Sequence, residues 1–115
     1  MNTVNNFIES NRERLLEELM DLLRIPSVSA DSKFKEEVRK TANFIKDKLM
    51  DAGVDKAEIY ETNGHPIVYA EKIISSELPT ILVYGHYDVQ PADPYELWDS
   101  DPFDPVIKNT AIHPE

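Results

Sequence analysis

The sequence predicts an α/β fold in which two N-terminal helices pack on part of a mixed β-sheet. Three observations lead to this prediction. Before Gly53, apolar residues recur every three to four positions, which is the helical period. From about residue 54 to residue 74 they alternate with polar ones, and a continuously apolar run follows at 80–84. Helices followed by strands in this order indicate a layered α/β arrangement.

The first predicted helix ends before Pro26. Its apolar residues fall mostly on one face and its charged residues on the other. The apolar set is Phe7, Ile8, Leu15, Leu16, Leu19, Met20, Leu22 and Leu23. Proline lacks a backbone donor and restricts the residue before it, so we place a short loop at 26–29. We expect the leucine stripe to pack into the core, although such a stripe could also form a partner interface.

A second helix is predicted to begin near Asp31 or Ser32 and to end before Gly53. Either of the first two residues can cap its first turn, and Glu36 and Glu37 suit the positive end of the helix dipole. Its apolar stripe consists of Phe34, Val38, Ala42, Ile45 and Leu49, widened by Phe44. Gly53 is placed to adopt the left-handed conformation just past the helix end.

Strands are predicted in the second half of the chain. The segment 54–62 alternates as a half-buried strand does, and 66–74 has the pattern of the returning strand of a hairpin. Asn63-Gly64 between them is a signal for a two-residue turn. The run 80–84 is continuously apolar or β-branched, so we place it inside the sheet with both faces covered. A further strand could begin at 106–108.

Composition limits the possible functions. The 115 residues include 12 Lys and Arg against 22 Asp and Glu, so the formal charge is 12 − 22 = −10. An acidic surface repels phosphate backbones, so we expect no nucleic-acid partner. The absence of cysteine excludes disulfides, thiolate metal sites and cysteine nucleophiles. No run reaches the roughly 18 apolar residues of a membrane helix, and the N-terminus lacks a signal-peptide pattern. We therefore expect a cytoplasmic protein without a membrane partner.

The segment 84–91 carries the strongest chemical signal. It begins where the predicted buried strand ends, and ligands of open α/β sheets bind outside the carboxyl ends of strands. His86 and Asp88 are two residues apart, so in an extended chain their side chains point to the same side. The carboxylate can then accept the imidazole N–H and leave the other ring nitrogen for a metal. Spacing alone leaves open a hydrogen-bonded histidine without a metal, because a zinc site needs three or four protein ligands.

Several motifs in the same order resemble a zinc-dependent peptidase family. They are Gly85-His86-Tyr87-Asp88-Val89-Gln90-Pro91, Trp98 with Asp101-Pro102-Phe103-Asp104-Pro105, Arg24-Ile25-Pro26-Ser27-Val28-Ser29, the Gly53 turn, and Gly64-His65-Pro66-Ile67-Val68-Tyr69-Ala70. The family includes cytosolic dipeptidases, glutamate carboxypeptidase, aminoacylases, acetylornithine deacetylase and succinyl-diaminopimelate desuccinylase. The resemblance runs from about residue 13 to about residue 108.

This resemblance implies a pair of zinc ions, with cobalt or manganese as alternatives, on a mixed α/β sheet. By resemblance, His86 binds one zinc ion and Asp88 is the catalytic-site carboxylate that orients His86. The implied reaction is hydrolysis of an amide bond by a metal-bridging hydroxide, with a glutamate as general base. Tyr87 and Gln90 favour the dipeptidase branch, so the implied substrate is a dipeptide or short peptide. N-acyl amino acid deacylation is the alternative within the family, and a non-catalytic remnant or interaction module is a third interpretation.

The family's second motif, an Ala-Arg-Gly segment leading to paired aspartates, is absent from these 115 residues. The bridging aspartate, the general-base glutamate and the last histidine ligand are expected after residue 115. We therefore interpret residues 1–115 as the N-terminal portion of the catalytic domain, without its remainder and without the dimerisation or lid domain. The parent enzyme is expected to be a homodimer. This portion alone is expected to hold at most one weak metal site and to be inactive.

Other polar and aromatic residues have simpler interpretations. His65 and His113 are expected to be surface histidines rather than ligands. The acidic run 93–104 is expected to be a solvated loop, because it lacks the spacing of a calcium loop. Trp98 and Phe103 are expected to anchor this loop to the core rather than to line a substrate pocket.

Overall fold

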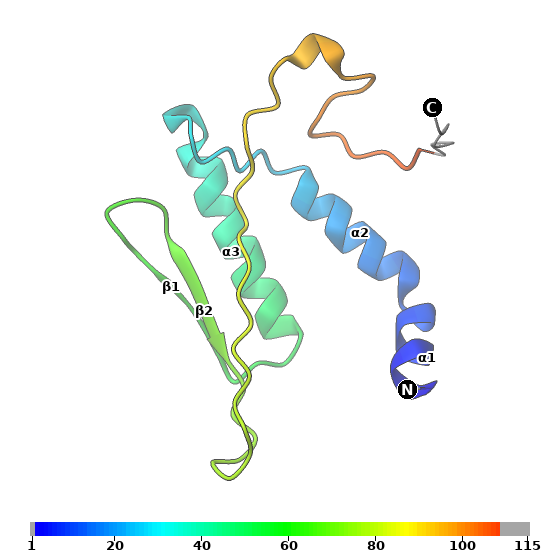
Figure 1. Ribbon diagram of the computed structural model, residues 1–115, viewed down its shortest axis with the longest axis vertical. Helices are drawn as coiled ribbons and strands as arrows, with labels where there is room; N and C mark the ends of the chain where they lie inside the picture. Colours follow the sequence, from blue (N-terminus) through cyan, green and yellow to red (C-terminus); the bar gives the residue numbers. More distant parts are fainter. Residues whose placement is uncertain (1, 109–115) are drawn as a thin grey trace, which may run out of the picture. The chain divides into compact units, whose positions relative to one another are not determined.

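The computed structural model describes residues 2–108 and divides into two compact units. In the described residues, the first unit comprises 2–24 and 92–108, and the second comprises 25–91. The helices and strands are α1 (Asn2–Ser10), α2 (Arg12–Leu23), α3 (Lys35–Asp51), β1 (Lys56–Tyr60) and β2 (Ile67–Glu71) (Figure 1). The first two helices belong to the first unit, and α3 with the two strands forms the second. The predicted α/β class is confirmed.

The first predicted helix is interrupted at Asn11. The side chain of Asn11 donates a hydrogen bond from Nδ2 to the carbonyl of Phe7 at 2.8 Å, and its backbone angles are φ −115° and ψ 9°. An asparagine side chain that bonds the backbone in this way competes with the regular helical ladder. The helix therefore resumes as α2, which ends at Leu23, before Pro26 as predicted.

The apolar stripe of α1 and α2 is exposed, so the predicted core packing of these leucines is wrong. None of the described residues in either helix is buried, and Leu19 is 50% exposed. Helical periodicity identifies an apolar face, but burial also requires a surface that packs against it.

Within residues 2–108, no helix has the length and apolar character that crossing a membrane requires.

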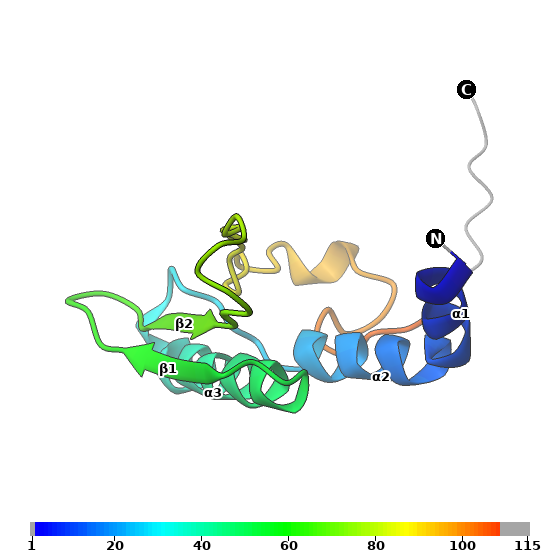
Figure 2. The ribbon, with the colours of Figure 1, turned by 90° about the horizontal axis from the view of Figure 1, so that it is seen from below.

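The core of the second unit lies between α3 and one face of the hairpin (Figures 1 and 2). Val38, Thr41 and Ala42 are buried on α3 at three-to-four spacing. Ala57 and Ile59 occupy the half-buried, alternate positions of β1. Both the apolar stripe of the second predicted helix and the half-buried strand after it are therefore confirmed.

Helix α3 begins and ends close to the predicted residues. Asp31 caps the 3₁₀ turn Ser32–Phe34 that leads into the helix, by accepting a backbone hydrogen bond at 3.0 Å. At the other end, Gly53 adopts φ 86°, and the amides of Gly53 and Val54 donate to carbonyls of the last turn. This is the left-handed cap predicted for Gly53, which a residue with a Cβ would adopt only under strain.

The hairpin has a wider loop than the sequence predicts. The strands pair antiparallel with Tyr60 opposite Ile67, so residues 61–66, six in all, connect them instead of a two-residue turn at Asn63-Gly64. The hydroxyl of Thr62 makes two hydrogen bonds to backbone groups inside the loop, at 3.0 and 2.7 Å. The backbone groups that these bonds satisfy are the amide of Gly64 and the carbonyl of His65. In a tighter turn, such groups would instead pair between the two strands.

The segment 80–84 is the largest departure from the prediction. It forms no strand and follows β2 as an extended trace (Figure 1). Its apolar side chains are 84–90% exposed: Ile81, Leu82, Val83 and Tyr84. A strand buried on both faces needs neighbours in the sheet and cover above and below. The sheet of the described residues consists of β1 and β2 alone, and the one isolated parallel bridge, Val28 with Val89, lies outside it, so these neighbours are lacking. The stretch 106–108 likewise forms no strand.

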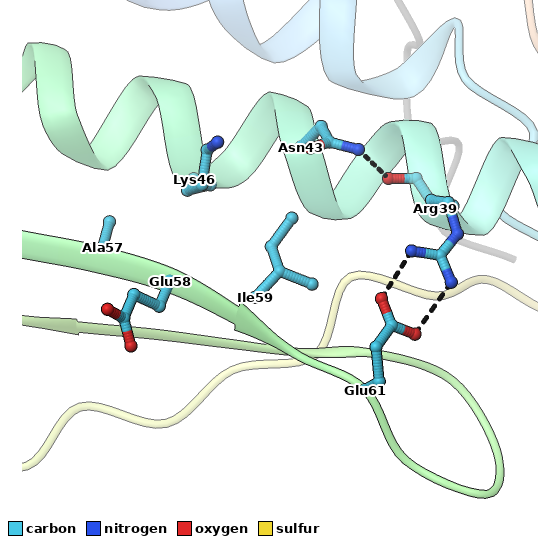
Figure 3. A pocket seen from close by; sticks show the side chains of 7 residues that line it. All are labelled: Arg39, Asn43, Lys46, Ala57, Glu58, Ile59 and Glu61. Carbon is cyan, nitrogen blue, oxygen red and sulfur yellow. Dashed lines mark hydrogen bonds and ion pairs between the residues drawn. The ribbon is translucent and has the colours of Figure 1, made fainter.

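An ion pair joins α3 to the hairpin loop. The guanidinium of Arg39 donates to both carboxylate oxygens of Glu61, at 2.6 and 2.8 Å. The pair lies at a shallow groove that is lined by residues of α3 and β1 (Figure 3). The hydrogen bonds from Arg39 hold the pKa of Glu61 below its ordinary value of 4.5.

Replacing Glu61 with glutamine is expected to lower the resistance to urea more at pH 7 than at pH 3. The pKa of this carboxyl group is lower in the folded state than in the unfolded state. At pH values above the unfolded-state pKa, the ion pair contributes its full stabilisation, and the contribution is lost as the pH falls through the folded-state pKa. The check is urea unfolding of both proteins, with Glu77→Gln at an exposed carboxylate outside the ion pair as the control. An equal difference at both pH values would contradict this account of the ion pair.

Candidate metal centre

Two segments that are distant in the sequence, 25–29 and 86–91, form the backbone of the candidate site. Val28 and Val89 make an isolated parallel bridge, and the amide of Val89 donates to the carbonyl of Ser27 at 3.0 Å. The hydroxyl of Ser27 donates to a carbonyl of the other segment at 2.8 Å. Ser27 and Val28 are buried, so the loop predicted after the first helix has a defined place beside the second segment.

His86 and Asp88 lie next to each other, as their spacing predicts. Nδ1 of His86 is 3.1 Å from Oδ1 of Asp88 and 3.1 Å from its backbone oxygen. A carboxylate and a carbonyl only accept hydrogen bonds, so Nδ1 carries the ring proton. In the neutral ring Nε2 is then a free lone-pair nitrogen, which receives no hydrogen bond within the described part of the chain. The side chain of His86 is 75% exposed, so Nε2 is accessible.

Ser29 holds the other oxygen of the same carboxylate. Its Oγ donates to Oδ2 of Asp88 at 2.6 Å. This hydrogen bond is the main cause of a lowered pKa of Asp88. Burial is the second-largest effect and raises the pKa, and the bond from His86 lowers it further. Asp88 is therefore an anion at neutral pH with a partner on each oxygen. Ser29 belongs to the motif 24–29, but no local pattern in the sequence predicts this contact, because the two residues are 59 positions apart.

The hairpin loop supports this region from another side. The hydroxyl of Tyr87 donates to the carbonyl of Pro66, and burial raises the pKa of Tyr87. Nε2 of His65 is 2.9 Å from the carbonyl oxygen of Ser29, and it is the donor because a carbonyl only accepts. His65 is exposed, as expected for a surface histidine.

The described residues supply an incomplete donor set. Within residues 2–108, no group of three or more His, Asp or Glu side chains has the arrangement needed to hold a metal ion. His113 lies outside the described residues. The pair of His86 and Asp88 fits one ligand with its orienting carboxylate, and the chemistry of a complete site requires further donors.

The acidic run 93–104 belongs to the first unit. Trp98 donates from Nε1 to the carbonyl of Ala92 at 2.9 Å, so this side chain is tied to its own loop, and it remains 52% exposed. Lys108 lies 2.9 Å from a carboxylate oxygen of Asp99, and that contact lowers the pKa of Asp99. This carboxylate is therefore paired with a lysine of the same loop.

Curated dipeptidases are similar to most of this chain. No protein-family model matches it. The chain is 32% identical over 112 residues to a Cys-Gly metallodipeptidase of Saccharomyces cerevisiae. This match covers 87% of this chain and 23% of that protein. It is 30% identical over 103 residues to a cysteinylglycine-S-conjugate dipeptidase of Corynebacterium striatum, covering 89% of this chain and 23% of that protein. The chain is therefore related to metallodipeptidases over most of its own length.

A solved structure agrees with this similarity to dipeptidases. A solved structure of a dipeptidase from Saccharomyces cerevisiae matches with a TM-score of 0.79 at 30% identity, over 88% of this chain and 23% of that one. A succinyl-diaminopimelate desuccinylase of Nitrosospira multiformis is 47% identical over 38 residues, 33% of this chain. The chain thus spans 23% of the length of the dipeptidases named above.

Proposed function

We propose that this chain is the N-terminal part of the catalytic domain of a metal-dependent dipeptidase. The observation that carries the proposal is the pair of His86 and Asp88, in which the carboxylate binds Nδ1–H and leaves Nε2 free. Similarity to dipeptidases extends over 87% and 89% of the chain, against 33% for the desuccinylase. The difference in coverage favours peptide hydrolysis over N-acyl amino acid deacylation.

In this proposal His86 is a metal ligand through Nε2, and Asp88 holds its ring in the required tautomer. A carboxylate on the distal N–H also makes the ligating nitrogen more basic, which strengthens its bond to a metal. The full enzyme would use two zinc ions, with cobalt or manganese as alternatives, because sites of histidine and carboxylate accept several of these ions. When bound, the metals would polarise the amide carbonyl and supply a hydroxide at neutral pH.

The remaining ligands and the general base would lie outside these 115 residues. The chain alone would then hold at most one weak metal site and hydrolyse nothing, because one histidine does not make a zinc site. We further propose a cytoplasmic homodimer that acts on short peptides. Its net charge of −10 argues against a nucleic-acid partner.

Hydrolysis of Cys-Gly by the full-length protein is expected to depend on a divalent metal. Dialysis against a chelator should abolish it, and addition of zinc, manganese or cobalt should restore it. The measurement is release of glycine, with an N-succinyl amino acid as the comparison substrate for deacylation. Preferential turnover of the succinyl compound would favour the deacylase, and turnover of neither would favour a non-catalytic module. Tight stoichiometric zinc on the 115-residue chain, measured by calorimetry, would contradict the incomplete ligand set.

A further inference from the structure

Ser29 reaches the carboxylate of Asp88 from the other segment of the site. The Oγ–Oδ2 distance of 2.6 Å is that of a hydrogen bond between a hydroxyl and a charged carboxylate. Nδ1 of His86 occupies the other oxygen, Oδ1, at 3.1 Å. The three side chains therefore form a chain of hydrogen bonds that ends at the imidazole.

Two partners on two different oxygens limit the rotation of the Asp88 carboxylate. The terminal torsion of an aspartate side chain is broad when nothing restrains it. The side chain of Asp88 is 43% exposed. If the hydroxyl of Ser29 were removed, water would therefore replace it as the partner of Oδ2. The plane of the carboxylate would then no longer be set by the protein, and neither would the direction of its bond to His86.

We propose that Ser29 is a positioning residue that holds the Asp88 carboxylate in the plane that orients His86 Nε2 for a metal ion. This inference rests on the proposed function, because it assumes that Nε2 of His86 binds a metal. The hydroxyl of Ser29 touches neither metal nor substrate in this arrangement. Its effect passes through Asp88 to the imidazole.

Ser27 provides a matched control for this proposal. It lies two residues earlier in the same loop, and its hydroxyl also donates to the segment that carries His86. Its acceptor is the carbonyl of Tyr87, at 2.8 Å, and not the carboxylate. Ser27 is buried, whereas Ser29 is half-buried. If the two hydroxyls only tied the two segments together, Ser27→Ala would impair the site at least as much as Ser29→Ala.

The test compares zinc affinity and turnover in full-length wild type, Ser29→Ala, Ser29→Thr, Ser27→Ala and His86→Ala. Zinc dissociation constants come from competition with a chromogenic chelator. Ser29→Ala is expected to weaken zinc binding about 3- to 10-fold, below the ~10–100-fold typical of a residue that contacts the ligand directly. Its kcat should fall by a similar factor while KM for Cys-Gly changes little. Ser29→Thr keeps the hydroxyl, so its zinc affinity and kcat should be close to those of wild type. Ser27→Ala should lower the urea midpoint without weakening zinc binding.

A second readout needs no metal. In the metal-free protein, nitrogen NMR shifts of the His86 ring report whether the proton resides on Nδ1, and Ser29→Ala is expected to decrease that population relative to Ser27→Ala. Zinc affinity of Ser29→Ala within twofold of wild type, or an equal loss in Ser27→Ala, would overturn the role of Ser29. If His86→Ala itself left zinc binding and hydrolysis intact, the proposed function would fall first. Loss in His86→Ala with none in Ser29→Ala would reject the positioning role alone.

Discussion

Replacing His86 with alanine in the full-length protein is expected to lower kcat/KM for Cys-Gly by about 10³-fold or more. A metal acting as a Lewis acid contributes several kcal/mol to transition-state stabilisation, and each 1.36 kcal/mol is a factor of ten in rate. His86 is exposed and its side chain packs against little of the unit, so the loss should not come from unfolding. The measurements are glycine release, metal content and the urea midpoint of the metal-free protein.

His65→Ala is the matched control for this prediction. It removes an imidazole from the same unit, but from a surface loop where Nε2 donates to a backbone carbonyl instead of being free. We expect its metal content to equal that of wild type. Retention of bound metal and of activity by His86→Ala would show that the ligand has been assigned to the wrong residue. Loss of metal in His65→Ala alone would assign it to the hairpin loop.

Replacing Val38 with aspartate is expected to unfold the unit formed by residues 25–91. Val38 is 0% exposed, between α3 and the hairpin. An unpaired buried charge costs about 4 kcal/mol or more. A domain of ordinary stability has only about 5–15 kcal/mol, and small units lie at the lower end. The expected result is loss of the cooperative urea transition of this unit and of the helical circular dichroism that α3 contributes.

Two further variants make this prediction quantitative. Val38→Ala removes two buried methyl groups without adding charge and is expected to cost about 2 kcal/mol. Asn43→Asp adds the same charge to an exposed position of α3 and should leave the transition almost unchanged. Wild-type stability in Val38→Asp would mean that α3 does not pack on the hairpin as the structure shows.

Local patterns predict much of the second unit. The stripe containing Val38 and Ala42, the cap at Gly53 and the alternation around Ile59 each follow from residues within one or two turns of chain. The turn at Asn63-Gly64 was predicted too tight, because the Thr62 hydroxyl offers the loop other hydrogen bonds. Propensity describes the two central residues of a turn and not the bonds that flanking side chains make.

Apolar runs predict burial less reliably than they predict an apolar face. The segment 80–84 and the leucines of α1 and α2 have the composition of buried elements, yet they are exposed in the described residues. A sequence pattern states which side chains favour a dry environment. Whether that environment exists depends on surfaces contributed by other segments, and these lie outside any local window.

The sequence by itself determined the helices, the hairpin and the proximity of His86 to Asp88, because these depend on the period of the backbone. It also supported the family assignment through the order of its motifs. Only the tertiary structure decided that Ser29 binds the far oxygen of Asp88 and that 80–84 has no partner strand within residues 2–108. Both facts depend on which distant segments meet, and that is set by packing of the whole chain rather than by any local run of residues.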